Sequence, residues 1–407
     1  MAFRFEIRYM WKFLLLLMLV ITSCSEKQIN ENVINVAEAM GRLSKEQSTQ
    51  DLFSSVSYIP LETNEQAIIG KYPECIIMDS VIVLSSVHQN LKLFDRIKGK
   101  YIRDIGHVGT DPEGYAKDAW GKVSFWVDAV QKTIYVLGWN NDFLLYGFDG
   151  EYKDRIQLQD ETNCILSQNY YLMDTGRIWG HNKMKLSPEM PSVFYIDSNT
   201  MALTDIVTWN VALLPMDEVL SVSNLLGGYV AYGGDLAIAE FTGERKYYTA
   251  INSPSLWKST DAIRLKQAFN DTIYTISEKG LTPYLVFELG GWRWNEQRQL
   301  DIEGCDKKIA IDYVLENAEY IYFHFHIGLY LEKSQSYCGI YDKEKKTVVC
   351  QEGDNLFDKE NNQHIQIRGV SSDGCFFALL QPDELSDDNQ QRMGVEEEGN
   401  PIIAVLY

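Results

Sequence analysis

Short hydrophobic runs recur along most of the chain, and the polar positions between them predict a protein built from β-strands. From residue 51 onward, β-branched and aromatic residues alternate with breaks that contain Gly, Asn or Asp. Such runs are typical of strands joined by hairpin turns, whereas long stretches with the 3.6-residue helical period are missing from the sequence pattern. Aromatic residues make up 12% of the chain, and their flat side chains pack well on pleated sheets. We therefore expect an all-β fold.

One unit of two or three strands recurs along the sequence. A first run such as Asp79–Leu84 is followed by a second run that ends in a hydrophobic residue plus Asp, such as Leu91–Asp95, and then by a turn. Seven such kernels follow one another at intervals of 44 to 55 residues. Strand-rich repeats of about 40–50 residues are typical of β-propellers, whose blades stack around a ring. The kernels are centred near Val81, Ile134, Ile178, Tyr229, Ile273, Ile321 and Phe376.

The two ends of this repeat region both look like strands. Val56–Leu61 and Pro401–Tyr407 are hydrophobic runs of strand length. If they pair within one blade, the ring closes and no open sheet edge remains. We expect a single closed β-propeller over residues 51–407, with the terminal strands closing the ring.

The first 24 residues have the pattern of an export signal. Basic residues precede the nine-residue apolar run Phe13–Ile21, and small residues lead to Cys24. An apolar core of nine residues is too short to span a bilayer, which needs about 20. We predict a lipoprotein signal peptide at residues 1–23, lipidation of Cys24, and a flexible tether at residues 24–50. An ordinary cleaved signal and an uncleaved anchor are the alternatives.

Three segments give the chain a family resemblance, in addition to the lipidation motif. They are the opening Ser57–Thr63, the exit of the first repeat at Asp104–Tyr115, and Asn400–Tyr407 after an acidic insert. With these segments the chain resembles the uncharacterised six-bladed β-propeller lipoproteins of Gram-negative gut bacteria. The resemblance implies six blades, with the region around Tyr229 supplying strands of a neighbouring blade, although seven kernels would also fit seven blades. It also implies an outer-membrane lipoprotein that faces either the periplasm or the outside.

Charge and cysteine content narrow the function classes. The net charge of −20 would repel a phosphate backbone, so nucleic acid is excluded as a partner. The cysteines show no metal-ligand spacing. Cys338 and Cys350 flank a hairpin and could face each other across it, but we favour buried, reduced thiols. The acidic run Asp383–Glu398 is expected to form a solvated loop.

Two aromatic and amide segments are the candidate ligand-binding residues. Each reads as a loop that follows a strand, where a propeller collects its binding groups: Trp139 with Asn140 and Asn141, and Trp179 with His181 and Asn182. A tryptophan face can stack on a sugar ring, but large aromatics also pack between propeller blades. The Gly-rich segment Gly106–Tyr115 is interpreted as an inter-blade turn.

His324 and His326 form a weaker candidate, for a metal site. They are two residues apart in a strand-like run and should therefore point to one face. Two imidazoles can bind a metal ion, yet the sequence names no third ligand.

Catalytic motifs are missing from the sequence, so we expect a non-enzymatic module. We predict that it binds or scaffolds a glycan, a peptide or an envelope protein, with the lipid anchor holding it to the membrane. A hydrolase or lyase acting on a polysaccharide or lactone at the central channel is the alternative, because propellers host both kinds of function. We assign no cofactor; a divalent cation such as calcium would belong to the alternative.

Overall fold

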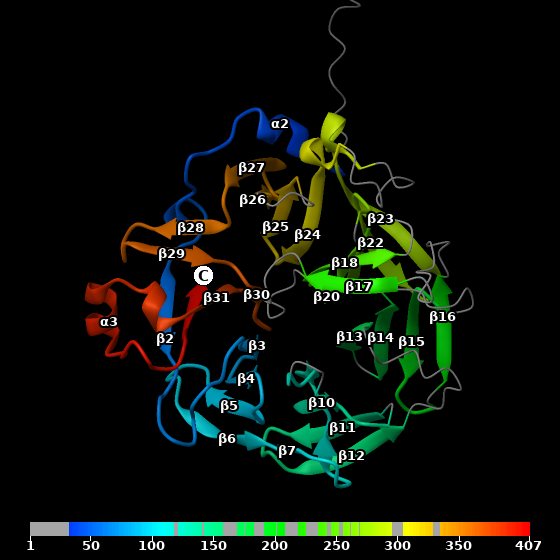
Figure 1. Cartoon of the computed structure of the whole chain (residues 1–407), viewed down its shortest axis with the longest axis vertical. Helices are drawn as coiled ribbons and strands as arrows, with labels where there is room; N and C mark the ends of the chain where they lie inside the picture. Colours follow the sequence, from blue (N-terminus) through cyan, green and yellow to red (C-terminus); the bar gives the residue numbers. More distant parts are fainter. Residues whose placement is uncertain are drawn as a thin grey trace, which may run out of the picture. The chain divides into compact units, whose positions relative to one another are not determined.

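Antiparallel sheets dominate the structure and follow one another around a ring (Figure 1). Residues 34–407 form one compact unit. The protein is a β-propeller, as the sequence pattern predicts, and it has the six blades that the family resemblance implies. The computed structural model describes residues 32–117, 121–140, 142–157, 169–174, 176–182, 191–200, 202–207, 219–224, 235–241, 246–251, 255–260, 262–267, 269–294, 304–328 and 334–407.

Each blade contains four antiparallel strands, and in blade 4 the short strand β1 (Val33–Ile34) adds a fifth beside β23. The hairpins arise from the repeated strand–turn–strand units of the sequence. Blade 1 consists of β3 (Glu74–Ile77), β4 (Val81–Ser85), β5 (Leu91–Asp95) and β6 (Tyr101–Ile105). Blade 2 consists of β9 (Phe125–Asp128), β10 (Thr133–Leu137), β11 (Asp142–Gly147) and β12 (Tyr152–Gln157). Blade 3 consists of β13 (Asn169–Asp174), β14 (Arg177–Asn182), β15 (Val193–Asp197) and β16 (Leu203–Val207).

Blades 4 and 5 continue this pattern, and blade 6 combines strands from both ends of the ring. Blade 4 contains β20 (Leu256–Lys258), β21 (Ile263–Lys266), β22 (Thr272–Ser277) and β23 (Gly280–Phe287). Blade 5 consists of β24 (Ile309–Glu316), β25 (Tyr320–Ile327), β26 (Gln335–Asp342) and β27 (Thr347–Glu352). Blade 6 consists of β30 (Gly369–Val370), β31 (Phe376–Leu380), β32 (Ile402–Leu406) and β2 (Val56–Pro60).

The ring closes through β2 and β32, as predicted from the two terminal runs. The strands pair antiparallel, with Val56 opposite Leu406 and Pro60 opposite Ile402. Because β2 comes from the start of the propeller and β32 from its end, this pairing joins the first and last parts of the ring and covers the edge of β32.

The region between blades 3 and 4 differs from our expectation. Strands β17 (Val219–Asn224), β18 (Asp235–Phe241) and β19 (Lys246–Ile251) form their own three-stranded sheet. They are therefore an insertion and do not supply strands to a neighbouring blade; Tyr229 itself lies outside the described residues. Since β13 of blade 3 contacts β20 of blade 4 directly, the seventh kernel adds no seventh blade.

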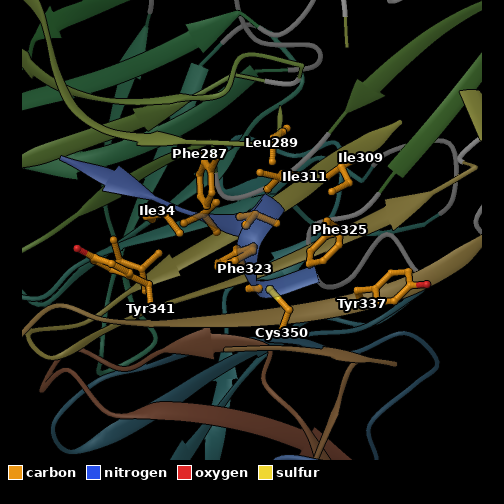
Figure 2. Close-up of a cluster of buried hydrophobic side chains, with 14 of the residues drawn as sticks. Ile34, Phe287, Leu289, Ile309, Ile311, Phe323, Phe325, Tyr337, Tyr341 and Cys350 are labelled. Atoms are coloured by element: carbon orange, nitrogen blue, oxygen red, sulfur yellow. The ribbon is translucent and has the colours of Figure 1, made fainter. Parts of the chain in front are cut away.

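The hydrophobic core lies between the blades. Among the described residues, six clusters of buried side chains each join two neighbouring blades. The cluster between blades 4 and 5 is rich in aromatic side chains, including Phe287, Phe323 and Phe325 (Figure 2). In the register of blade 5, the Phe323 ring lies over Gly339, where a Cβ atom would come within 2.1 Å of it. A larger residue at position 339 would displace this ring.

An aspartate at the end of several of the described strands closes the turn that follows. The carboxylate of Asp95 accepts hydrogen bonds from the backbone amides of Ile97 and Lys98, at 3.0 and 2.7 Å. This local bond holds the backbone in a turn, which explains why the motif marks each hairpin. Equivalent bonds are made by Asp128, Asp197 and Asp358.

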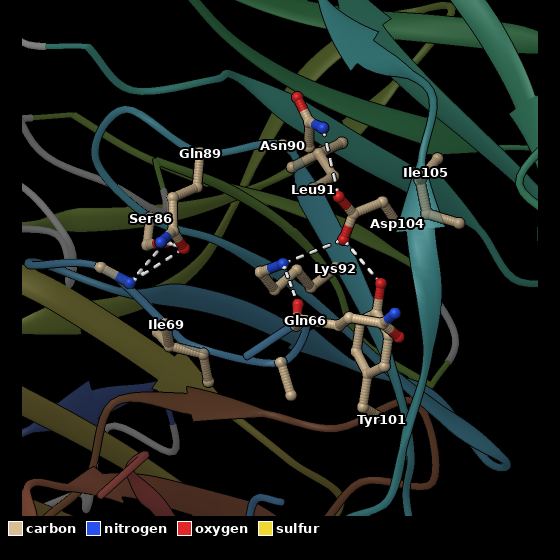
Figure 3. A network of polar contacts seen from close by, with 12 residues as sticks. Gln66, Ile69, Ser86, Gln89, Asn90, Leu91, Lys92, Tyr101, Asp104 and Ile105 are labelled. Atoms are coloured by element: carbon tan, nitrogen blue, oxygen red, sulfur yellow. Dashed lines mark hydrogen bonds and ion pairs between the residues drawn. The ribbon is translucent and has the colours of Figure 1, made fainter. Parts of the chain in front are cut away.

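A paired polar network holds the loop before blade 1 against that blade (Figure 3). The Lys92 amine donates to the carboxylate of Asp104 at 2.9 Å and to the carbonyl of Gln66 at 2.7 Å. Asp104 also accepts hydrogen bonds from Asn90 and Tyr101. The charges of this network are thus used to fix a loop.

The described part of the predicted tether packs on the propeller. Short strand β1 (Val33–Ile34) precedes helix α2 (Val36–Met40), and Ile34 and Val36 are fully buried in the cluster between blades 4 and 5. Further along, the Ser44 amide donates to the carbonyl of Cys350 on β27. This packing differs from the flexible tether that we predicted up to residue 50, because its apolar residues find a hydrophobic cluster to cover.

The acidic insert near the C-terminus also differs from a plain solvated loop. It contains the 3-10 helix η7 (Pro382–Glu384) and the helix α3 (Asp387–Met393). Ser386 caps the start of α3, and Gly394 ends it with a φ of 66°, a conformation that glycine adopts readily. The remaining short elements are η1 (Thr49–Asp51), β7 (His107–Val108), β8 (Gly114–Tyr115), η4 (Gly290–Trp292), η6 (Cys305–Lys307), β28 (Asn355–Asp358) and β29 (Gln363–Gln366).

Cys338 and Cys350 are both free thiols. Cys338 belongs to the cluster between blades 5 and 6, whereas Cys350 belongs to the cluster between blades 4 and 5. The two side chains therefore lie on opposite faces of blade 5 and cannot form a disulfide without rearrangement. Burial raises the pKa of Cys350 to about 12 and keeps it protonated.

The helices within the described ranges are all too short or too polar to cross a membrane.

Candidate functional site

The first aromatic segment lies on the turn that follows β10 in blade 2. Trp139 is 50% exposed, and its indole N–H donates to the carbonyl of Gly109 at 2.5 Å. The backbone amide of Asn140 donates to the carboxylate of Asp142 at 3.2 Å. Asn141 lies outside the described residues. This turn therefore presents one exposed tryptophan, held by the neighbouring Gly-rich segment.

That Gly-rich segment, Gly106–Tyr115, connects blades 1 and 2, as predicted. Tyr115 is fully buried; its hydroxyl donates to the carbonyl of Ile105 and accepts from the amide of Leu91, both at 2.9 Å. At Gly106, with a φ of 52°, a Cβ atom would come within 2.4 Å of the Tyr146 ring. The segment is built for inter-blade packing.

The second aromatic segment is not a loop. Trp179, His181 and Asn182 belong to β14, so the expectation that they follow a strand is corrected. Trp179 is 3% exposed in the cluster between blades 3 and 4, and His181 Nδ1 lies 2.8 Å from the hydroxyl of Ser255. Asn182 pairs with Asn169 through the backbone. Trp179 and His181 thus contribute to packing between blades, and they do not join Trp139 in one site.

The two histidines of β25 gain the third partner that the sequence did not name. In the register of β24 and β25, Ile311 lies opposite Phe325 and Tyr313 lies opposite His324. Asp312 is thus the extra residue of a β-bulge, and such bulges commonly re-aim a side chain. Its carboxylate oxygens lie 2.7 and 2.8 Å from His324 Nδ1, and one lies 3.1 Å from His326 Nδ1.

All three side chains are almost completely buried on the blade 5 face that is turned toward blade 6. His324 and His326 are each 5% exposed, and Asp312 is 6% exposed. The ring of Tyr313 stacks on His324, with centroids 5.2 Å apart. Tyr313 belongs to the hydrophobic cluster shared with blade 6, so the site is enclosed by apolar side chains.

The Asp312 carboxylate and the His326 imidazole shift each other's pKa, and His324 also acts on Asp312. Burial alone would raise the pKa of Asp312, but the adjacent His324 and His326 hold that pKa well below its usual range. Burial would lower the pKa of His326, yet the negative charge of Asp312 raises it. The site therefore holds an ionised carboxylate within a nonpolar enclosure.

A polar path leads from this cluster toward the surface of blade 6. The carboxylate of Asp354 lies 3.9 Å from His324 Nε2, and it accepts a hydrogen bond from Gln366. Gln366 in turn accepts from Arg368. Both residues line a groove of about 210 Å³, whose other lining residues are Asn355, Gln363, His364, Leu379, Leu380 and Glu384.

Lys266 of blade 4 is a buried cation near the cluster. It is 7% exposed, and its amine lies 3.0 Å from the carbonyl of Gln267 and 3.4 Å from that of Ile311. Burial lowers its pKa to about 8, while the charges of Asp271 and Asp312 act in the opposite direction. Sequence reasoning missed both Lys266 and Asp312. Asp312 is a charge inside the otherwise hydrophobic run of β24, which is a signal that could have found it, whereas the sequence IRLK of β21 does not single out Lys266.

Fold and site together define a six-bladed β-propeller with a buried His-His-Asp cluster between two blades. The chain belongs to a family described as a domain of unknown function, DUF4934, whose model matches residues 31–407. No curated protein matches the chain.

Solved structures show similarity in fold. A "putative exported protein" from Bacteroides fragilis is 15% identical, with a TM-score of 0.59 over 89% of this chain and 98% of that one. The β-propeller domain of Cps50 (Swd1) from Myceliophteria thermophila is 9% identical, with a TM-score of 0.36 over 78% of this chain and 96% of that domain.

Proposed function

We propose that the protein is a non-catalytic binding or scaffolding module of the cell envelope, anchored by a lipid on Cys24. Its partner is a glycan, a peptide or an envelope protein. The exported neighbour from Bacteroides fragilis and the export signal at residues 1–23 support this location.

The groove between the β28–β29 hairpin and blade 6 is the observation that carries the binding role. It is lined by the side-chain amides of Asn355, Gln363 and Gln366, together with Arg368 and Glu384. Amide and charged groups beside the apolar Leu379 and Leu380 suit a ligand with many hydrogen-bonding groups, such as a sugar or an extended peptide. Exposed Trp139 on blade 2 offers a second contact surface.

The alternative of a propeller enzyme calls for titratable groups from several blades that converge at the central channel. In the part of the chain that the structure describes, the three residues that converge, Asp312, His324 and His326, all come from blade 5. They are buried against blade 6 and have no exposed approach for a large substrate. This arrangement favours the binding module over the hydrolase or lyase.

A binding experiment on the soluble form, residues 25–407, tests the proposal. A glycan array and an envelope-protein pull-down should each be run with wild type and with the groove variant His364→Ala/Gln366→Ala. We expect a retained ligand whose affinity falls at least about tenfold in the variant, because two polar contacts are lost. The exposed His107→Ala serves as the matched control. Turnover of a bound glycan, or binding that the groove variant leaves intact, would overturn the proposal.

The location is tested separately by cell fractionation. We expect Cys24→Ala to release the protein from the membrane fraction, because lipid chains provide the anchor. Wild-type membrane association of this variant would contradict the lipoprotein assignment.

A further inference from the structure

Two nitrogens of the buried histidine pair have no aligned hydrogen-bond partner. His324 Nε2 is buried, and the carboxylate of Asp354 stands too far from it, at 3.9 Å, for a hydrogen bond. His326 Nδ1 lies 3.1 Å from a carboxylate oxygen of Asp312, but the two are not aligned for a hydrogen bond. Leaving a buried polar atom unpaired costs about 1–3 kcal/mol, so a missing partner is the natural explanation.

The same three side chains have the composition and spacing of a metal site. One carboxylate oxygen of Asp312 and one ring nitrogen from each histidine lie within 4.8 Å of one another. Tetrahedral bonds of about 2.1 Å place donor atoms about 3.4 Å apart, which small side-chain shifts would provide here. The imidazole planes are inclined by 74°, so the rings approach one point from different directions.

We propose that Asp312, His324 and His326 bind a divalent transition-metal ion, with Zn²⁺ as the expected occupant. Two imidazoles and one carboxylate suit zinc and related ions, whereas calcium prefers a shell of oxygen ligands. The calcium that accompanied our alternative function is therefore not the ion that these donors select. This inference is independent of the proposed binding role.

The ion would act as a link within blade 5. Asp312 comes from β24 and both histidines come from β25, so one ion bridges two adjacent strands at the bulge. Because the ligand set is assembled only in the folded chain, a bound ion stabilises the native state by mass action. The path through Asp354 toward the blade 6 groove offers the route by which an ion enters.

Metal binding is tested on the untagged soluble form after treatment with a chelator. Zinc is titrated in competition with a chromophoric chelator, and cobalt is used as a spectroscopic probe of nitrogen ligation. We expect one tightly bound equivalent and a higher melting temperature with zinc. Binding of less than about a tenth of an equivalent, or no thermal shift, would overturn the proposal.

Ligand variants locate the ion. His324→Gln and His326→Gln should each weaken zinc binding at least about 100-fold, because a metal ligand is lost. His107→Gln, which changes an exposed histidine paired with Asp111, should leave the affinity unchanged. Equal binding by all three variants would place the ion elsewhere and contradict the assignment.

A further variant tests the site without removing a ligand. The Lys266 charge acts on Asp312, so Lys266→Met should tighten zinc binding several-fold by removing a competing cation. Unchanged or weaker binding, with the melting curve still cooperative, would argue against an ion at Asp312.

Discussion

Blade 5 carries two buried polar clusters, one on each face, and they are built differently. Toward blade 4, Glu316 ends β24 with its side chain completely buried. Toward blade 6, Asp312 on the same strand contacts His324 and His326. Both clusters place a carboxylate among apolar neighbours, and they differ in how many donors that carboxylate receives.

The Glu316 carboxylate is surrounded by donors from two blades. It accepts hydrogen bonds from Trp257 at 2.7 Å, Ser259 at 3.2 Å and Lys343 at 2.6 Å. Arg264 adds a second cation, with its Nε 3.6 Å away. Because Trp257, Ser259 and Arg264 come from blade 4 and Glu316 from blade 5, this cluster joins the two blades.

The Asp312 carboxylate receives fewer donors, and they come from blade 5 alone. One carboxylate serves two imidazoles, and a buried nitrogen of each ring lacks an aligned partner. The comparison teaches that a buried carboxylate with donors from two blades links those blades. A buried cluster with unpaired atoms, by contrast, has the capacity to bind something more. The predictions below use this contrast.

The largest effect is expected from removing Glu316. Glu316→Ala removes the carboxylate from the buried Arg264 and the half-buried Lys343, which should lower the free energy of unfolding by about 3–5 kcal/mol. Chemical denaturation measures the change. The exposed neighbour variant Glu319→Ala should stay within about 0.5 kcal/mol of wild type. A loss below about 1 kcal/mol for Glu316→Ala would show that the cluster does not hold the blades.

A smaller loss is expected on the other face. Asp312→Asn, measured with a chelator present, should lower the free energy of unfolding by about 2 kcal/mol, because the amide oxygen can still accept a hydrogen bond from His324. Glu360→Gln is the control, because it removes one negative charge from an exposed side chain. A cost equal to that of Glu316→Ala would remove the distinction between the two clusters.

The sequence predicts the ring far better than it predicts these clusters. Turn-closing residues such as Asp95 and Asp197 recur because each hairpin needs the same local bond, so they are visible as a repeat. The alternation of β25 likewise places His324 and His326 on one face, as expected. The contribution of Asp312 depends on a bulge and on the register between two strands, and neither can be read from a single sequence.

The aromatic segments teach a related lesson. Trp139 and Trp179 each follow or end a hydrophobic run and are followed by polar residues, yet one is half exposed and the other is buried. Burial between blades is a tertiary property, so local sequence does not separate the two cases.

Two buried cations on β21 sharpen the comparison through pH. Arg264 faces the Glu316 carboxylate. The amine of Lys266 instead donates to the backbone carbonyls of Gln267 and Ile311, and burial lowers its pKa to about 8. Because the pKa of Lys266 is lower in the folded protein than in the unfolded chain, the unfolded chain binds the proton more tightly at a pH between the two values. Protonation therefore destabilises the native state in that range. Stability should therefore rise as the pH increases from about 8 to 10.

The test compares wild type with Lys266→Met across that range in the presence of a chelator. Wild type should gain about 1–2 kcal/mol relative to the variant between pH 8 and 10. Deprotonation of unfolded cysteines acts in the opposite direction in both proteins, so only their difference is informative. Parallel pH profiles of the two proteins would show that the pKa of Lys266 is not lowered in the folded state.

The smallest effect is expected at Trp139, which belongs to neither cluster. Trp139→Ala removes a half-exposed ring and one hydrogen bond to the carbonyl of Gly109, so the free energy of unfolding should fall by less than about 1 kcal/mol. Chemical denaturation is again the measurement, with the buried Trp179→Ala as the contrasting variant, for which cavity formation gives a clearly larger loss. If both variants lose the same stability, the blade 2 turn supports the ring as firmly as the inter-blade core does. Trp139 would then be a packing residue and not a contact surface for a partner.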